Sequence, residues 1–301
     1  MIAALAIRVG QAWALCAAVQ LALWAIQQRT RNAGIVDVGW ALSFALVAAG
    51  FAARATAPVA AWAPIAAVVC AWSLRLGGHL IVRGAARSPE DGRYADLRQR
   101  WAPRAARRFF VFFQAQAALA ALLSTAFAVP FLAAPWDGGW LRGLGAALAA
   151  AGVLGEAVAD AQLARWKRDP ARRGQVCDAG LWSWSRHPNY FFEWYFRIGH
   201  AIYGVAFAPR GLVALAGQVV ILASILKVSG IPATEAQALR SKGDAYRTYQ
   251  ARVPAVVPMP AKCSTMRADR SPLLPVLRRN VSTCFRRCAV ASPLYPGSWA
   301  G

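Results

Sequence analysis

The sequence predicts an all-α, polytopic membrane protein with about seven transmembrane helices and a cofactor pocket that faces the cytoplasm. The chain of 301 residues is 58% hydrophobic and only 16% charged, and its mean hydropathy is +0.37. Soluble domains carry about 25% charged residues, so this composition indicates a membrane protein. Apolar runs close to the ~20 residues that a spanning helix needs recur along the chain. Basic and neutral connections between these runs alternate without a break, as the positive-inside rule requires.

The apolar runs define seven expected spans. In chain order they cover residues 2–26, 36–53, 59–82, 109–133, 140–164, 190–208 and 212–231. The second and sixth runs are short, so they must stand nearly upright or draw in flanking residues. The first run lacks a basic n-region and is longer than a usual signal-peptide core. We therefore expect it to be a membrane helix and not a cleavable signal.

The connections between the spans predict the topology. Three of them are strongly basic: residues 27–35 hold two arginines, residues 83–108 hold eight, and residues 165–189 hold six basic side chains. The intervening connections carry one arginine or none; they are residues 54–58, 134–139 and 209–211. Because basic loops stay in the cytoplasm, the N-terminus is expected outside and the C-terminus in the cytoplasm.

The net charge of +21 lies largely in these juxtamembrane loops. Orientation and contact with anionic membrane lipids explain it before any nucleic acid does, although a cytoplasmic polyanionic ligand could use the same residues. The cysteines show neither zinc spacing nor a disulfide framework, so we expect no metal site. Residues 261–301 are rich in Pro, Ser, Arg and Cys and lack an apolar period. They are expected to form an irregular or disordered basic tail after a working membrane domain of residues 1–260.

Polar side chains inside the spans are the first candidates for a site, because such groups are costly in a bilayer unless they are paired. Arg75 lies too deep in the third span to snorkel easily, which favours an inward position against an anion or a carboxylate. His79 follows it by one turn on the same face. Glu156 and Asp160 stand four residues apart in the fifth span and repel each other, so a cation or hydrogen-bond donor should oppose them.

The segment GLWSWSRHPNYFFE at residues 180–193 is the most informative in the chain. The start of an ordinary transmembrane helix needs an aromatic or basic anchor. It does not need Asn189 followed by Glu193 on the buried side. Glu193 can pair with Arg197 inside their own helix, which is the structural alternative to a role at a site. Together the third, fifth and sixth spans can enclose a polar cavity that opens to the cytoplasm.

Two further features flank this cavity. Asp37 begins the second span, where a carboxylate also suits the helix dipole. After Pro232 an amphipathic cytoplasmic helix is expected, with Tyr246 and Tyr249 on one face. That helix either closes over a ligand or lies on the membrane surface with its tyrosines at headgroup depth.

Six segments follow one another along the chain in a recognisable order. They are DVGW, AWSLRLGGHL, ADAQL, GLWSWSRHPNY, SGIP and DAYRTYQARVPAVVP. This order resembles a bacterial membrane family related to steroid 5-alpha-reductase over about residues 30–260. Isoprenylcysteine carboxyl methyltransferases share the His-Pro-x-Tyr theme and the helical architecture. The resemblance therefore implies a multi-pass protein of the bacterial inner membrane.

The resemblance implies an NADPH-dependent reductase that acts on the C=C bond of an enone, a steroid-like molecule or another lipid. The catalytic residues that we expect from it are Asp37, which matches the helix-two acid only loosely, and Glu193. The expected cofactor-binding residues are Arg75, Asp160, Gln162, Arg165, Lys167, Arg186, His187, Asn189, Tyr190, Tyr246 and Tyr249. Two positions depart from the family pattern: Trp72 stands where a proton-donating tyrosine is expected, and Glu235 replaces a cofactor-contacting histidine.

Two other functions compete with this interpretation. Methyl transfer from S-adenosylmethionine would need acidic or aromatic contacts to the sulfonium, where NADPH needs arginines for its phosphates. A non-catalytic transporter or lipid-binding scaffold would be favoured by inverted repeats, and the sequence shows none.

Overall fold

The protein is described by a computed structural model that covers residues 2–85, 89–136, 139–228 and 230–260. The chain divides into two compact units, residues 1–262 and 263–301. The predicted tail, residues 261–301, lies outside the described residues. Within the described ranges the regular secondary structure is entirely helical, which confirms the predicted all-α class.

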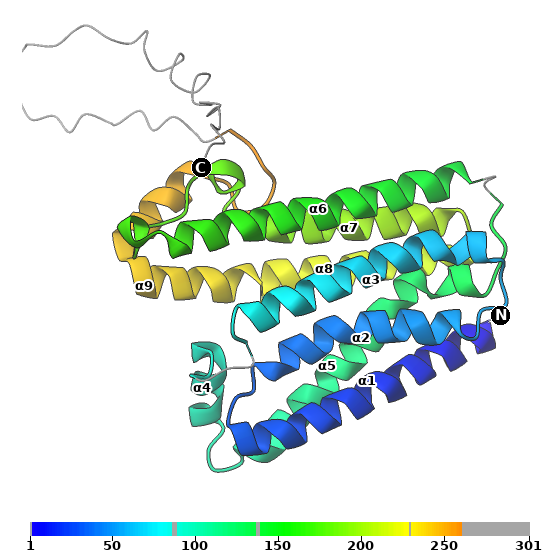
Figure 1. Ribbon diagram of the computed structural model, residues 1–301, viewed down its shortest axis with the longest axis horizontal. Helices are drawn as coiled ribbons and strands as arrows, with labels where there is room; N and C mark the ends of the chain where they lie inside the picture. Colours follow the sequence, from blue (N-terminus) through cyan, green and yellow to red (C-terminus); the bar gives the residue numbers. More distant parts are fainter. Residues whose placement is uncertain (1, 86–88, 137–138, 229, 261–301) are drawn as a thin grey trace, which may run out of the picture. The chain divides into compact units, whose positions relative to one another are not determined.

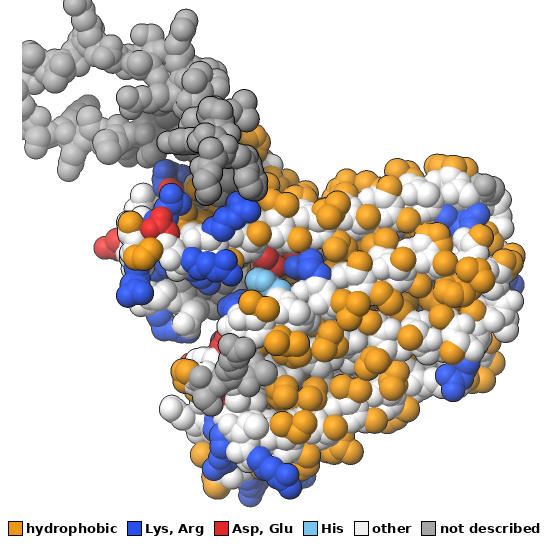
Figure 2. Space-filling view, viewed as in Figure 1, with side chains coloured by type: hydrophobic (Ala, Val, Ile, Leu, Met, Phe, Trp, Pro, Cys, Tyr) orange, Lys and Arg blue, Asp and Glu red, His pale blue; other side chains and the backbone are white. Residues whose placement is uncertain are grey.

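Nine α-helices are formed by the described residues. They are α1 (Ile2–Thr30), α2 (Ile35–Ala52), α3 (Val59–Val82), α4 (Gly92–Arg100), α5 (Ala105–Ala128), α6 (Trp140–Arg168), α7 (Pro188–Val205), α8 (Val213–Ala223) and α9 (Ile231–Arg252). The long helices run side by side, and α4 lies at one end of them (Figure 1). We call this end, where α1, α3 and α6 finish, the α4 end. Basic side chains gather there on the face that Figure 2 shows, while hydrophobic side chains cover the flanks of the helices.

Among the described residues, six helical runs are long and apolar enough to cross a membrane. They are Ile2–Thr30, Ile35–Ala52, Val59–Val82, Ala105–Phe131, Trp140–Arg168 and Arg210–Arg252. The protein is thus a multi-pass membrane protein. The sixth predicted span, α7, falls short of this criterion because Glu193, Arg197 and His200 lower its hydropathy. The last run is not one straight helix: α8 ends at Ala223, and a π-helical turn connects it towards α9.

Glycines bring α6 and α7 into backbone contact. A Cβ atom at Gly152 of α6 would lie 2.6 Å from the backbone nitrogen of Phe196, and one at Gly199 of α7 would lie 2.4 Å from that of Ala149. Only glycine permits so close an approach, as in the small-residue interfaces of membrane helices. As a result Glu193 of α7 comes within electrostatic range of Glu156 on α6, although α7 alone is not apolar enough to count as a span.

Aromatic rings fill the space between α2, α3 and α7. Trp72 is only 1% exposed. Its ring stacks on that of Phe196, with centroids 5.2 Å apart, and meets Phe44 edge to face at the same distance. Such pairs are favourable beyond their buried area. This aromatic core fixes the positions of the charged side chains that adjoin it.

Candidate functional site

The charged residues of α3 and α6 form a buried polar cluster. Arg75 Nη2 lies 2.6 Å from Glu156 Oε1, and Nη1 donates to Asp160 Oδ2 at 2.9 Å. His79 Nε2 is 4.0 Å from the same Asp160 oxygen. The expectation that a cation opposes the two acids is therefore confirmed, and Arg75 is that cation. We call Arg75, His79, Glu156 and Asp160 the ladder.

Glu193 continues the ladder on α7, within electrostatic range of Glu156. Its Oε1 accepts hydrogen bonds from Arg197 Nε at 3.0 Å and Nη2 at 2.9 Å, and its Oε2 accepts from Trp72 Nε1 at 2.7 Å. The pairing with Arg197 that the four-residue spacing allowed is thus present. Trp72, which cannot donate a proton to a substrate as an acid would, instead orients this carboxylate.

Arg197 is held inside the aromatic core and is only 2% exposed. Its guanidinium carbon lies 4.8 Å from the ring centroid of Trp72 and 5.0 Å from that of Phe196. Cation–π contacts of a desolvated arginine are worth about 2 kcal/mol. The aromatic rings and Glu193 together stabilise a positive charge deep inside the bundle.

The ladder keeps unused hydrogen-bonding capacity. Arg75 Nε and Glu156 Oε2 are buried and have no hydrogen-bond partner, and Arg75 Nη2 meets Glu156 only as an ion pair. Buried polar groups are almost always satisfied, so unpaired ones call for a ligand or water. An ion-paired arginine and glutamate inside the membrane-spanning part thus keep one unpartnered donor and one unpartnered acceptor.

Basic side chains follow the ladder towards the α4 end. Lys167 lies seven residues beyond Asp160 on α6 and interacts electrostatically with Arg83 and Lys242. Lys242 Nζ donates to the carbonyl of Gln175. Across the described residues, Arg83 and Lys167 form no side-chain hydrogen bond or ion pair. We call Arg83, Lys167 and Lys242 the basic triad. It offers positive charge to an anionic ligand.

A surface pocket of about 340 Å³ lies beside the last turns of α6. Gln162, Arg165 and Trp166 line it on α6, and Cys177 and Gly180 line it opposite. Gln162 Oε1 accepts a hydrogen bond from the backbone N–H of Leu181 at 2.9 Å. Two of the predicted cofactor residues, Gln162 and Arg165, thus lie at this pocket and not in the ladder.

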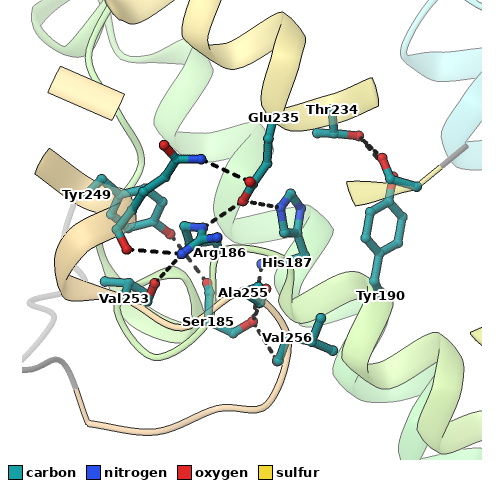
Figure 3. A network of polar contacts seen from close by, with 12 residues as sticks. Ser185, Arg186, His187, Tyr190, Thr234, Glu235, Tyr249, Val253, Ala255 and Val256 are labelled. Carbon is teal, nitrogen blue, oxygen red and sulfur yellow. Dashed lines mark hydrogen bonds and ion pairs between the residues drawn. The ribbon is translucent and has the colours of Figure 1, made fainter. Parts of the chain in front are cut away.

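The Arg-His-Pro-Asn-Tyr motif is engaged with α9 (Figure 3). Arg186 donates from Nε to Glu235 Oε1 at 2.7 Å and from Nη1 to the carbonyls of Gln250 at 3.1 Å and Val253 at 2.6 Å. His187 Nε2 lies 3.2 Å from the same Glu235 oxygen. Gln250 donates to the other Glu235 oxygen at 2.9 Å. We call this network the clamp; it uses the hydrogen-bonding capacity of Arg186 to fix α9.

The remaining predicted residues of this region support the clamp. Tyr190 and Thr234 share a hydrogen bond at 3.1 Å (Figure 3). Tyr249 donates to the carbonyl of Trp182 at 2.5 Å. Tyr246 lies beside Arg186 and Glu235. Asn189 accepts from the backbone N–H of Tyr190 at 3.1 Å. These contacts give a structural role to residues that we expected at the cofactor.

Asp37 is bound to α4, and within the described residues its side chain contacts no member of the ladder. Its Oδ1 accepts from the Tyr94 hydroxyl at 2.7 Å, and its Oδ2 lies 3.4 Å from Arg93 Nη2. Burial and the negative charge of Asp37 hold the pKa of Tyr94 well above its usual range. Asp37 and Glu193 are therefore not brought together as one catalytic pair.

Glu90, which comes just before α4, adds a second tie to the rest of the bundle. It accepts from the backbone N–H of Ala33 at 2.7 Å and from Arg98 at 2.9 and 2.7 Å. Burial raises the pKa of Glu90, but these hydrogen bonds and the Arg98 charge outweigh burial and lower it. This tie was not predicted from the sequence, because Ala33 and Glu90 are separated by 57 residues.

Fold and site together define an all-α membrane protein with a charged ladder inside its helical bundle. The chain belongs to the family described as "Protein of unknown function (DUF1295)", which matches residues 23–253. No protein of curated function and no solved structure matches the chain.

Proposed function

We propose that this protein is a membrane-embedded, NADPH-dependent reductase of a lipid C=C bond, as the resemblance to the steroid 5-alpha-reductase relatives implies. The observation that carries the proposal is the open donor and acceptor at Arg75 Nε and Glu156 Oε2. Ionisable groups inside a membrane span indicate function by default. Here they also include buried polar atoms that lack a hydrogen-bond partner, which a polar ligand would supply.

The residues present suit the cofactor. A nicotinamide carboxamide has both an acceptor and donors, which complement Arg75 Nε–H and Glu156 Oε2. The basic triad would hold phosphate groups. Glu156 and Lys167 are separated by about 16 Å along α6, at 1.5 Å per residue. An extended dinucleotide can therefore meet the ladder at one end and the basic triad at the other.

NADPH, when bound, supplies the hydride for the reduction. The chain binds and orients the cofactor and excludes water from the reacting atoms. Hydride addition to an enone leaves negative charge on the carbonyl oxygen, which a buried cation stabilises. Arg197 is the buried cation at the substrate side of the ladder. The proton that completes the reduction comes from the solvent side, where His79 is the titratable group beside Asp160.

Glu193 has a positioning role in this proposal. One of its oxygens accepts hydrogen bonds from Arg197 and the other accepts from Trp72. It thereby holds Arg197 in place. Asp37, tied to Tyr94, keeps α4 docked. The clamp holds α9 over the α4 end, where the cofactor would enter from the cytoplasm.

Binding to detergent-purified protein tests the proposal, with NADPH, NADH and S-adenosylmethionine titrated side by side. Arg75→Ala should weaken NADPH binding by at least about tenfold, because it removes a charged donor from a low-dielectric site. Lys167→Gln should weaken NADPH binding more than NADH binding, since only NADPH has a 2′-phosphate. Arg173→Gln, an exposed position in the same basic loop, is the matched control and should change neither.

Two results would reject the assignment. Binding of S-adenosylmethionine without NADPH would assign the protein to methyl transfer of the isoprenylcysteine carboxyl methyltransferase type. Binding of none of the three would favour a transporter or lipid-binding scaffold. If NADPH binds, its consumption with a model enone in lipid micelles tests the reaction.

A further inference from the structure

A second pocket, of about 490 Å³, lies at the start of α5 and is separate from the ladder. Arg104, Arg107 and Arg108 line one part of it, and Trp101, Val111 and Phe112 line the rest. The ladder belongs to α3 and α6, with its continuation on α7, whereas this pocket is built from the end of α4 and the first turns of α5. Nothing in the proposed reduction uses it.

The three arginines of this pocket are uncompensated. In the part of the chain that the structure describes, none of them forms an ion pair or a side-chain hydrogen bond, and all three are exposed. The neighbouring Arg98 differs: it is bound to Glu90 and lies over the ring of Phe109 at 4.7 Å. Three like charges around one pocket repel one another, so a bound anion would stabilise them.

The pocket changes from basic to apolar along α5. Arg104, Arg108 and Val111 follow each other at four- and three-residue spacing, so they lie on one stripe of the helix. Val111 is 59% exposed, and it belongs to the run Ala105–Phe131 that is apolar enough to span a membrane. The stripe therefore carries positive charge where the helix begins and an exposed aliphatic surface where it continues into the span.

Trp101 completes the pocket at the boundary between these two parts. Its ring packs edge to face on Phe109, with centroids 5.0 Å apart, and tilts against Phe112 at 6.2 Å. Tryptophan is enriched at the level of lipid headgroups. A soluble anion would use the arginines but not the adjoining apolar wall, whereas a phospholipid would use both.

We propose that this pocket binds one anionic phospholipid, with its phosphate at Arg104, Arg107 and Arg108 and the first part of an acyl chain along Val111 and Phe112. Juxtamembrane basic clusters attract anionic lipids. Here apolar side chains follow the arginines along α5, so the pocket also offers a surface for the acyl chain. The lipid would lie against both α4 and α5, because Trp101 comes from the end of α4.

Native mass spectrometry of the full chain in detergent tests this, with phosphatidylglycerol, phosphatidylcholine and inorganic phosphate as probes. The triple variant Arg104→Gln, Arg107→Gln, Arg108→Gln should retain phosphatidylglycerol at least about tenfold less well. The control triple Arg168→Gln, Arg172→Gln, Arg173→Gln removes the same charge from another loop and should retain it normally. Val111→Asp should also weaken retention, because it places an acid on the apolar wall.

Three outcomes would overturn the lipid site. Equal losses in the two triple variants would mean that lipid retention follows net charge and not this pocket. Full competition by inorganic phosphate would mean that the ligand is a soluble anion. Equal retention of phosphatidylcholine would remove the role of the arginines. Should the triple variant fail to fold, Arg108→Gln alone and the charge-retaining Arg108→Lys provide the same comparison, with only the first expected to lose lipid.

Discussion

The pair formed by Glu193 and Arg197 gives the sharpest test of how the buried charges are held. Glu193→Gln removes the negative charge but keeps an oxygen that can accept from Trp72. Arg197 then remains as a buried, uncompensated cation among aromatic rings, and it is only 2% exposed. Arg197→Met makes the opposite change, leaving Glu193 with the single donor of Trp72.

The magnitude follows from this burial. Removing one partner of a buried ion pair costs about 3–5 kcal/mol, and replacing both partners with apolar groups is often nearly neutral. Because glutamine keeps the shape and one hydrogen bond, we expect Glu193→Gln to lower the free energy of unfolding by about 3 kcal/mol. The double variant with Arg197→Met should lose less than the sum of the single losses, by at least ~2 kcal/mol.

Unfolding in mixed micelles, followed by tryptophan fluorescence, measures these four free energies under one detergent condition. Additive losses would refute the view that the two residues act as one buried pair. NADPH turnover, normalised to folded protein, separates stability from function. If Glu193 only pairs with Arg197, turnover per folded molecule stays normal; if it also keeps the site in order, turnover falls in the folded fraction.

Further predictions concern packing, the α4 tie, the tail and the topology. Gly152→Leu should abolish stable α6–α7 packing, seen as loss of folded protein in size-exclusion chromatography, whereas the same change at the open Gly143 should be tolerated. Because the pKa of Glu90 is lowered in the folded protein, this residue stabilises the fold at pH values above its ordinary pKa of 4.5, and the stabilisation is lost as the pH falls through the folded pKa. Proteolysis near α4 should therefore increase in acid. Glu90→Gln should remove that pH dependence. Truncation after Pro260 should leave the melting temperature unchanged within a few degrees. Reporters inserted after Trp136 and Ala179 should lie on opposite sides of the membrane.

Local pattern was sufficient to predict most of the fold. Apolar runs and basic loops depend on neighbouring residues. The first six predicted spans agree with α1, α2, α3, α5, α6 and α7 to within a few residues, whereas the seventh, residues 212–231, extends past α8, which ends at Ala223. The opposition of Arg75 to Glu156 and Asp160 was also predictable, because a four-residue spacing puts two acids on one helix face. The hydropathy of α7 was harder to interpret, since its buried charges Glu193 and Arg197 are compensated by each other and by Trp72 of α3.

Partners that are distant in the chain were not predictable. Trp72 and Glu193 are separated by 121 residues, and Arg186 and Glu235 by 49. No periodicity in the sequence connects such pairs. Arg186 was therefore expected at the cofactor, whereas its hydrogen bonds go to α9 and to Val253 just after it. Glu235, treated as a substitution for a histidine, is instead the acceptor on which the clamp depends.

The clamp also imposes an order on biosynthesis. A chain leaves the ribosome from its N-terminus, so α3, α6 and α7 emerge before the residues that Arg186 needs. Until Gln250 and Val253 have been made, this arginine has no carbonyl partners and must stay hydrated. A nascent chain stalled before residue 253 could already contain the ladder but would lack the complete clamp. Helix α9, which is translated after the other described helices, is thus the one that completes the α4 end.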